Sequence, residues 1–177
     1  MSQFQTLEGA SAAFQSMVWE ALRGAKDASG AAILQDVSQV TLAAPYEITS
    51  AQRPTKNFFS VFLYRVQPNT NVAVPPPRIG APQVAPLALD LFYLLTPLTN
   101  EPENDQKLLG LALKRLHDVP ILIDSGTGIG APLQPVTGTI RIVQVSPPPE
   151  QLSYLWSAFR QPLHLAATFS LGPILLN

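Results

Sequence analysis

The fold is decided by two segments, PLALDLFYLLT (Pro86–Thr96) and QKLLGLALKRLHDVP (Gln106–Pro120), which a short acidic linker joins. The first segment is apolar on both faces, which is typical of a strand in the centre of a sheet. The second repeats leucine and alanine at spacings of three and four residues, which predicts an amphipathic helix. Neither segment contains a cluster of catalytic side chains. The best-patterned part of the chain is therefore built for packing, and this favours a protein that works through its shape and contacts.

Further elements are expected on both sides of this stretch, and a single α+β domain over residues 1–177 accommodates them. Helices are expected at 6–23, 104–117 and 150–159, and strands at 37–42, 57–66, 87–96, 138–145 and 163–171. Asn104 or Asp105 is expected to cap the central helix, and Pro173 to end regular pairing of the last strand. Strands and helices neither alternate nor separate cleanly, which indicates a mixed, mostly antiparallel sheet with helices packed on one face.

The composition excludes several classes of protein. Only 13% of the 177 residues are charged and the net charge is −1, so the basic surface that nucleic-acid binding requires is not present. No apolar run is long enough to span a membrane, and residues 1–10 do not have the pattern of a signal peptide. The chain has no cysteine, which excludes disulfides and thiolate metal sites. We expect assembly in the cytoplasm, and the shortage of charge favours a subunit that buries surface against partners.

Two segments are expected to reach beyond the packed core. Residues 67–86 contain six prolines and are interpreted as a long surface loop or arm. Residues 172–177 form an apolar tail, and Ile174, Leu175 and Leu176 would be exposed unless the tail docks. It could dock on a neighbouring subunit, adding a strand there, or fold back on its own domain.

Three groups of residues are candidates for reactive or ligand-binding sites. The sequence GTGIG (Gly126–Gly130) lacks the following helix of a phosphate loop, so a turn within the loop 126–135 is favoured. His117, Asp118 and Asp124 lie close together but have no second ligand pair at metal spacing, which favours a structural role. His164 lies far from any residue that would make it a base. No cofactor, metal or catalytic residue is predicted, and the chain is not expected to be an enzyme.

The remaining candidates are residues for contacts. Asp90 is a carboxylate inside an apolar strand, which is costly unless it is paired. Arg65 in the neighbouring expected strand is a natural partner, although Asp90 could instead face solvent or another subunit. Trp156, with Tyr154 and Phe159, is expected in the core, with a subunit contact as the alternative. The predicted interface residues are thus Asp90, Arg65, Trp156, Ile174, Leu175 and Leu176.

Four segments in the same order along the chain resemble one known family. They are FLYRV (Phe62–Val66), PLALDLFYLLT (Pro86–Thr96), LLGLALKRLHDVPIL (Leu108–Leu122) and LSYLWSAFRQP (Leu152–Pro162). The family is that of the tail-terminator, or cap, proteins of phage-tail-like contractile injection systems. The resemblance covers nearly the whole chain, and no single motif in it is catalytic.

The resemblance implies a ring, expected to be a hexamer, that ends the inner tube and contacts the last sheath ring. Such a cap would limit the length of the particle and stabilise the extended sheath, so the implied partners are further copies of this chain, the tube protein and the sheath protein. A heterologous ring needs two different complementary patches on each subunit. The alternative function is a baseplate or adaptor module of the same kind of particle.

Overall fold

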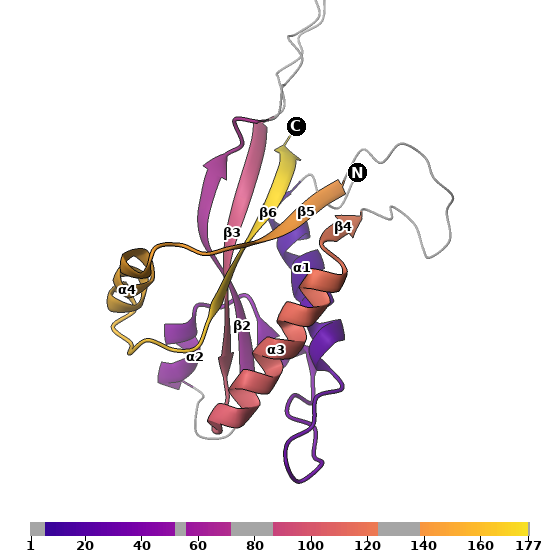
Figure 1. The fold of residues 1–177 in the computed structure, drawn as a ribbon, viewed down its shortest axis with the longest axis vertical. Coiled ribbons are helices and arrows are strands. Elements are labelled where there is room, and N and C mark those ends of the chain that lie inside the picture. The colour runs from indigo at the N-terminus through magenta and orange to yellow at the C-terminus, as the bar shows by residue number, and fades with distance from the viewer. Residues whose placement is uncertain (1–5, 52–55, 72–86, 124–138, 177) are drawn as a thin grey trace, which may run out of the picture.

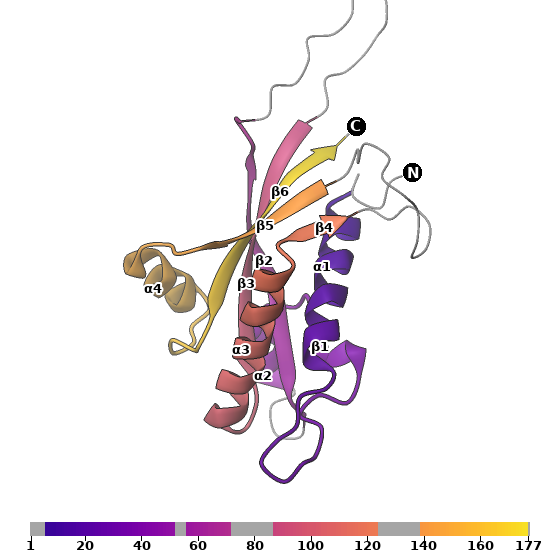
Figure 2. The same cartoon turned by 45° about the vertical axis from the view of Figure 1, so that its right-hand side comes forward.

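The computed structural model describes residues 6–51, 56–71, 87–123 and 139–176, which form a curled sheet with helices on both sides (Figures 1 and 2). The strands are β1 (Val40–Thr41), β2 (Phe58–Pro68), β3 (Leu87–Leu98), β4 (Ile121–Ile123), β5 (Thr139–Val145) and β6 (Ala167–Leu176). The helices are α1 (Leu7–Leu22), α2 (Pro45–Ala51), α3 (Pro102–Asp118) and α4 (Pro149–Ala158), with a 3₁₀ turn, η2, at Val37–Gln39.

These strands form one six-stranded sheet in the order β1-β2-β3-β6-β5-β4. Only β1 and β2 run parallel, and the other neighbours are antiparallel. The predicted α+β class and the mixed, mostly antiparallel sheet are confirmed. The apolar strand β3 lies between β2 and β6, as its two apolar faces indicated.

The main core lies between the sheet and the two long helices. Leu91, Tyr93 and Leu95 of β3 all belong to it, as alternation along a strand requires. The Tyr93 hydroxyl is buried and lies 2.7 Å from the Ser11 hydroxyl of α1. This hydrogen bond satisfies two polar groups inside an otherwise apolar layer and fixes α1 on the sheet.

The start of α3 differs from the prediction. Glu101 occupies the N-cap position and Pro102 the first turn, so the helix begins before Asn104 and Asp105. The fixed φ of proline suits the first helical position, where no N–H is needed. Asp105 instead accepts a hydrogen bond from the Thr99 backbone N–H at 2.9 Å and holds the preceding turn on the helix.

Helices also lie on the second face of the sheet, so the expectation that they share one face holds only for α1 and α3. Ile48 of α2 packs with Phe58 and Leu98 in a separate small cluster. The ring of Phe159, which follows α4, lies 5.7 Å from that of Phe62 in β2. The short helix α2 was not predicted, because Pro45 was interpreted as the end of a strand.

The last strand does not end at Pro173, so the expectation that pairing stops there is wrong, and residues 172–176 follow the alternative in which the tail folds back on its own domain. Pairing of β6 with β3 continues to Leu176, and Ile174 lies opposite Leu89. Between the Leu91–Leu171 and Leu89–Ile174 pairs, two residues of β6 face one residue of β3. This bulge tolerates the missing N–H of Pro173, so the strand passes through the proline.

The other differences are smaller. Pairing at 37–42 is limited to the two residues of β1, because the Asp36 side chain and Gln39 close a capping box around η2. Strand β6 begins at Ala167 rather than at 163, and the three-residue strand β4 was not predicted. Residues 72–86 of the proline-rich segment, the loop 126–135 and Asp124 lie outside the described residues.

Candidate functional site

The predicted ion pair between Asp90 and Arg65 does not form, although β2 and β3 are neighbours. An irregularity in β2 between Leu63 and Arg65 sets a register that places Arg65 opposite Phe92. The Arg65 guanidinium lies over the Phe92 ring, 5.2 Å from its centroid, and donates a hydrogen bond to the Gln67 side chain at 2.6 Å. The arginine is exposed, so its charge stays hydrated while its stem covers an aromatic ring.

The partner of Asp90 is an asparagine that sequence reasoning missed. The Asp90 carboxylate accepts a hydrogen bond from Asn69 Nδ2 at 2.8 Å, across the β2–β3 pair. The same carboxylate covers Gly172, where a Cβ atom would overlap Asp90 Oδ1. Asp90 therefore occupies the space that the missing glycine side chain leaves at the bulge, and it is only partly buried. The signal was present in the sequence as a glycine next to a proline in a strand, which is typical of a bulge.

Trp156 belongs to an aromatic cluster that attaches α4 to the second face of the sheet. The side chain is 2% exposed. The Phe159 ring lies 5.7 Å from the Trp156 ring and 5.5 Å from that of Tyr46 in α2. His164, expected in the core or on the sheet, contacts the Trp156 ring at 5.2 Å. The core interpretation thus holds for Trp156, and its role in a subunit contact stays a prediction.

Tyr154 was expected in the core with Trp156, and this is wrong. It is 75% exposed, because two residues along a helix place it on the side opposite Trp156.

The three aliphatic residues of the expected tail differ in their exposure. Ile174 is 1% exposed and is part of the main core, so its side chain is already covered within the chain. Leu175 is exposed beside Ala88, and Leu176 is partly buried against the core. A role of these residues in subunit contacts stays a prediction, and Leu175 is the one of them with most surface to offer.

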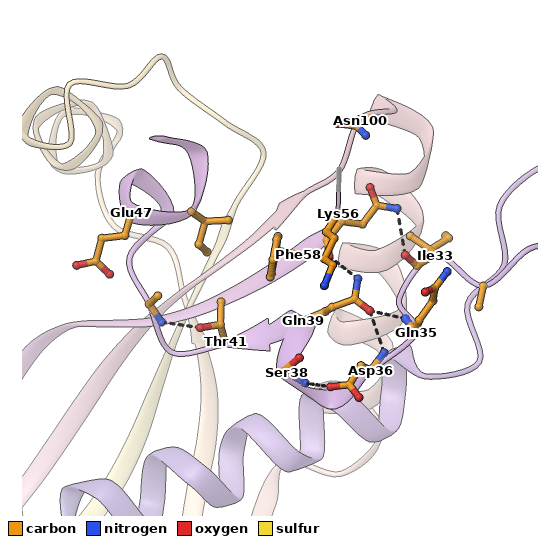
Figure 3. Close-up of a pocket in the computed structure, with 14 residues that line it drawn as sticks. Ile33, Gln35, Asp36, Ser38, Gln39, Thr41, Glu47, Lys56, Phe58 and Asn100 are labelled. Carbon is orange, nitrogen blue, oxygen red and sulfur yellow. Dashed lines mark hydrogen bonds between the residues drawn. The ribbon is translucent and has the colours of Figure 1, made fainter. Parts of the chain in front are cut away.

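A polar recess of about 1140 Å³ lies between η2, α2 and the start of β2 (Figure 3). Its wall is organised by Gln39, whose side-chain oxygen accepts from the Asp36 backbone N–H at 2.8 Å and whose amide donates to the Asn57 carbonyl at 2.8 Å. Asn57 in turn donates to the Ile33 carbonyl at 3.0 Å. These amide groups are hydrogen-bonded to the backbone and attach the loop to the sheet, so they are not directed at a ligand.

The charged groups at the recess do not converge. Glu47 lies on the opposite side from Asn100 and Lys56 (Figure 3). The Ser38 backbone N–H, at 2.8 Å, and then the Ser38 hydroxyl hold the pKa of the Asp36 carboxyl below its ordinary value. Asp36 is thereby a local cap for η2. The recess shows the features of a folded loop rather than those of a catalytic centre.

The described residues show neither a metal-ligand cluster nor a helix suited to cross a membrane. They contain no group of three His, Cys, Asp or Glu side chains that could hold a metal ion. His117 and Asp118 end α3, and the Asp118 carboxylate accepts from Lys114 Nζ at 2.9 Å. None of the described helices is both long enough and apolar enough to cross a membrane.

The large apolar side chains with the highest exposure, which sequence reasoning missed, lie on α4 and in the segment that follows it. Tyr154 is accompanied by Leu163, which is 71% exposed, and by Leu165. Only two of the 21 residues from 146 to 166, Glu150 and Arg160, are charged. Low charge with exposed Tyr and Leu is typical of protein interfaces. The low local charge was the signal in the sequence, but the pattern of a buried helix concealed it.

The fold thus defines an α+β protein with one mixed sheet and apolar side chains exposed around α4. The family model of the Pvc16 N-terminal domain matches residues 10–177, and the chain belongs to that family. This confirms the resemblance found in the four segments.

Solved structures similar to the chain include two that cover nearly all of it. One is the sheath/tube terminator, in the extended state, of an extracellular contractile injection system, PVC, with a TM-score of 0.63 and 15% identity over 97% of this chain. The other is the tube-terminating cap of the anti-feeding prophage, with a TM-score of 0.62 and 18% identity over 99% of this chain. The chain spans 57% of the length of each of these proteins. At such identities the likeness establishes the fold. No curated protein matches the chain significantly.

Proposed function

We propose that this chain is the ring-forming part of a structural cap, or tail terminator, of a contractile injection system. The observation that carries the proposal is the family match over residues 10–177, because it covers the whole described sheet and all of its helices except the first three residues of α1. The two similar structures, whose names describe a sheath/tube terminator and a tube-terminating cap, support the same role. The cap would end the inner tube, contact the last sheath ring and keep the sheath extended.

The proposed role includes homo-oligomerisation, with a hexameric ring as the expected state, and assembly in the cytoplasm. The role requires no catalysis, so no enzymatic activity is proposed. Two physical properties support the ring. Only 13% of the residues of the chain are charged, and apolar side chains are exposed around α4. A heterologous ring requires two different complementary patches on each subunit, and the apolar surface at α4 is suited to be one of them.

The test is electron microscopy of particles from cells with and without this chain, together with a gold label on a tagged chain in otherwise normal particles. We expect the label at one end of each particle, opposite the baseplate. Without the chain we expect particles of irregular length or particles that have already contracted. Normal lengths and ends without the chain reject the cap. A label at the baseplate end indicates the adaptor instead.

A further inference from the structure

The segment 146–166 projects from the second face of the sheet and is here called the α4 arm (Figures 1 and 2). It consists of the prolines before α4, the helix itself and the segment that leads into β6. Phe159 attaches it to Phe62 of β2 and Tyr46 of α2. Its outward side chains Tyr154 and Leu163 are largely exposed among the described residues, and Leu165 is about half exposed. The arm is therefore attached through one side and leaves a second apolar side open.

The same face of the sheet has a part that none of the described helices covers, here called the open face. Strand pairing places Val143, Ser170, Phe92 and Arg65 in one row across β5, β6, β3 and β2. Arg141, Gly172, Asp90 and Gln67 follow in the next row. Val143 is 51% exposed, and both arginines are exposed. The open face thus combines the apolar side chains of Val143 and Phe92 with Ser170 and the Asp90 carboxylate, and it has one arginine at each end.

The outer faces of the long helices α1 and α3 are poor candidates for a contact between subunits. The Glu20 carboxylate pairs with Arg23 at 3.0 Å on α1, and Asp118 pairs with Lys114 at 2.9 Å on α3. A partner on these faces would have to remove water from charges that are already paired and hydrated, which costs more than it returns. The α4 arm carries only Glu150 and Arg160 as charged residues, so covering it requires less desolvation, and Glu150 can replace the water around one arginine of the open face.

Charge and size indicate what covers each surface. The open face carries two arginines, Arg65 and Arg141, against the single carboxylate of Asp90, which already accepts from Asn69. The arm carries Glu150 near the start of α4, where it can approach an arginine of the open face. The arm has 21 residues, of which those on its open side are free to contact a neighbour, so it would supply part of the roughly 20–30 residues that each side of a standard interface contributes.

We propose that the α4 arm of one subunit packs on the open face of the next subunit around the ring. Tyr154 and Leu163 lie over Phe92 and Val143 of the neighbour, and Glu150 faces one of its arginines. The contact is heterologous, since the two surfaces differ, and repetition by rotation closes a ring. This inference rests on the proposed cap function for the existence of a ring, and it names the surfaces that form it.

The experiment uses the absence of cysteine from the chain. Leu163→Cys and Val143→Cys are introduced singly and together into the full chain, and a short bis-maleimide cross-linker is added to purified protein and to assembled particles. Both positions are exposed, so neither substitution should affect folding. The matched control has Glu20→Cys and Lys114→Cys on the outer faces of α1 and α3.

We expect the double variant to give a ladder of covalent dimers and larger oligomers. Each single variant alone should give no dimer, whereas a mixture of the two single variants should give dimers and nothing larger. The control pair should give no ladder. Dimers from Leu163→Cys alone would indicate an arm-to-arm contact and overturn the proposal.

Cross-linking in assembled particles, together with the position of the labelled chain, distinguishes this inference from the proposed function. If the chain is at the particle end and the Leu163–Val143 pair gives no ladder there, the arm contact is wrong while the cap function stands. If the chain is not at the particle end but the purified double variant gives the ladder, the cap function fails and the arm contact stands. A ladder from the control pair alone would place the interface on the long helices and reject the α4 arm.

Discussion

Replacing Gly172 with alanine tests the contact that sets the register of β6. A Cβ atom at this position would overlap Asp90 Oδ1 and lie 3.0 Å from Asp90 Cγ. Because Asp90 is on the neighbouring strand, its side chain must rotate away to accept the new methyl group. Rotation breaks its 2.8 Å hydrogen bond from Asn69. The substitution should therefore destabilise the fold through one identifiable side chain.

The size of the effect follows from two opposing contributions. A hydrogen bond to a charged group contributes about 1.5–3 kcal/mol, and the low end applies because Asp90 is partly exposed. Alanine also restricts the unfolded chain, which stabilises the fold by about 0.4–1 kcal/mol. We expect Gly172→Ala to lower the free energy of unfolding by about 1 kcal/mol. In an Asp90→Ala background the overlap is removed, so the same substitution should be neutral or stabilising.

The assay is urea unfolding of the four proteins of this double-mutant cycle, followed by circular dichroism. The coupling energy between Gly172→Ala and Asp90→Ala should be about 1–2 kcal/mol. Gly110→Ala is the matched control, because no atom outside its own helix lies within 4 Å of a Cβ at that exposed position in α3. It should stabilise the protein by about 0.5–1 kcal/mol. If Gly172→Ala is equally destabilising with and without the Asp90 carboxylate, the steric argument is wrong.

Three further substitutions test the core and the arm. Leu109→Ala should lower the free energy of unfolding by about 2–5 kcal/mol, and Leu113→Ala by less, because Leu109 is buried whereas Leu113 is only partly buried; equal losses in urea unfolding would mean that the buried face of α3 is misplaced. Tyr93→Phe should cost about 1 kcal/mol through the lost Ser11 hydrogen bond. Burial raises the pKa of Tyr93, so its hydroxyl stabilises the fold below pH 10 and this stability is lost as the pH rises further; the difference between wild type and Tyr93→Phe should shrink above pH 10, and a constant difference would contradict this. Phe159→Ala should expose the α4 arm to limited proteolysis while the sheet core keeps its circular dichroism, since three aromatic contacts meet at that ring; unchanged cleavage would refute the attachment.

The long elements could be predicted from the sequence because each has one repeating pattern over ten or more residues. The apolar run of β3 and the three-and-four spacing in α3 identified both the central strand and the helix that packs on it. Short elements lack this length. The seven residues of α2 and the three of β4 are held by their neighbours rather than by a pattern of their own.

The candidate site could be predicted only in part, because side-chain partners depend on register. One irregularity in β2 determines that Asp90 lies opposite Gln67, whereas regular pairing onward from Leu63 and Tyr93 would place Val66 there. Spacing along the sequence reveals neither this shift nor the hydrogen bond from Asn69. The bulge at Gly172 likewise lets β6 continue through Pro173. Burial of Trp156 and exposure of Tyr154 on the same helix depend on how α4 attaches, which only the tertiary contacts decide.

The irregularity in β2 and the bulge at Gly172 of β6 share one physical explanation with the incomplete helical cover of the second face. Both lie in the half of the second face that α2 and α4 leave uncovered, where Arg65 lies over Phe92 and Asp90 covers Gly172. Bulges are common next to functional surfaces because they redirect side chains and interrupt pairing. A helix over this half would bury Arg65 away from water at a cost of several kcal/mol, whereas a partner that brings Glu150 can pair with that arginine while Asp90 keeps its hydrogen bond from Asn69. The open face is thus unsuited to a further helix of its own chain and suited to the arm of a neighbouring subunit.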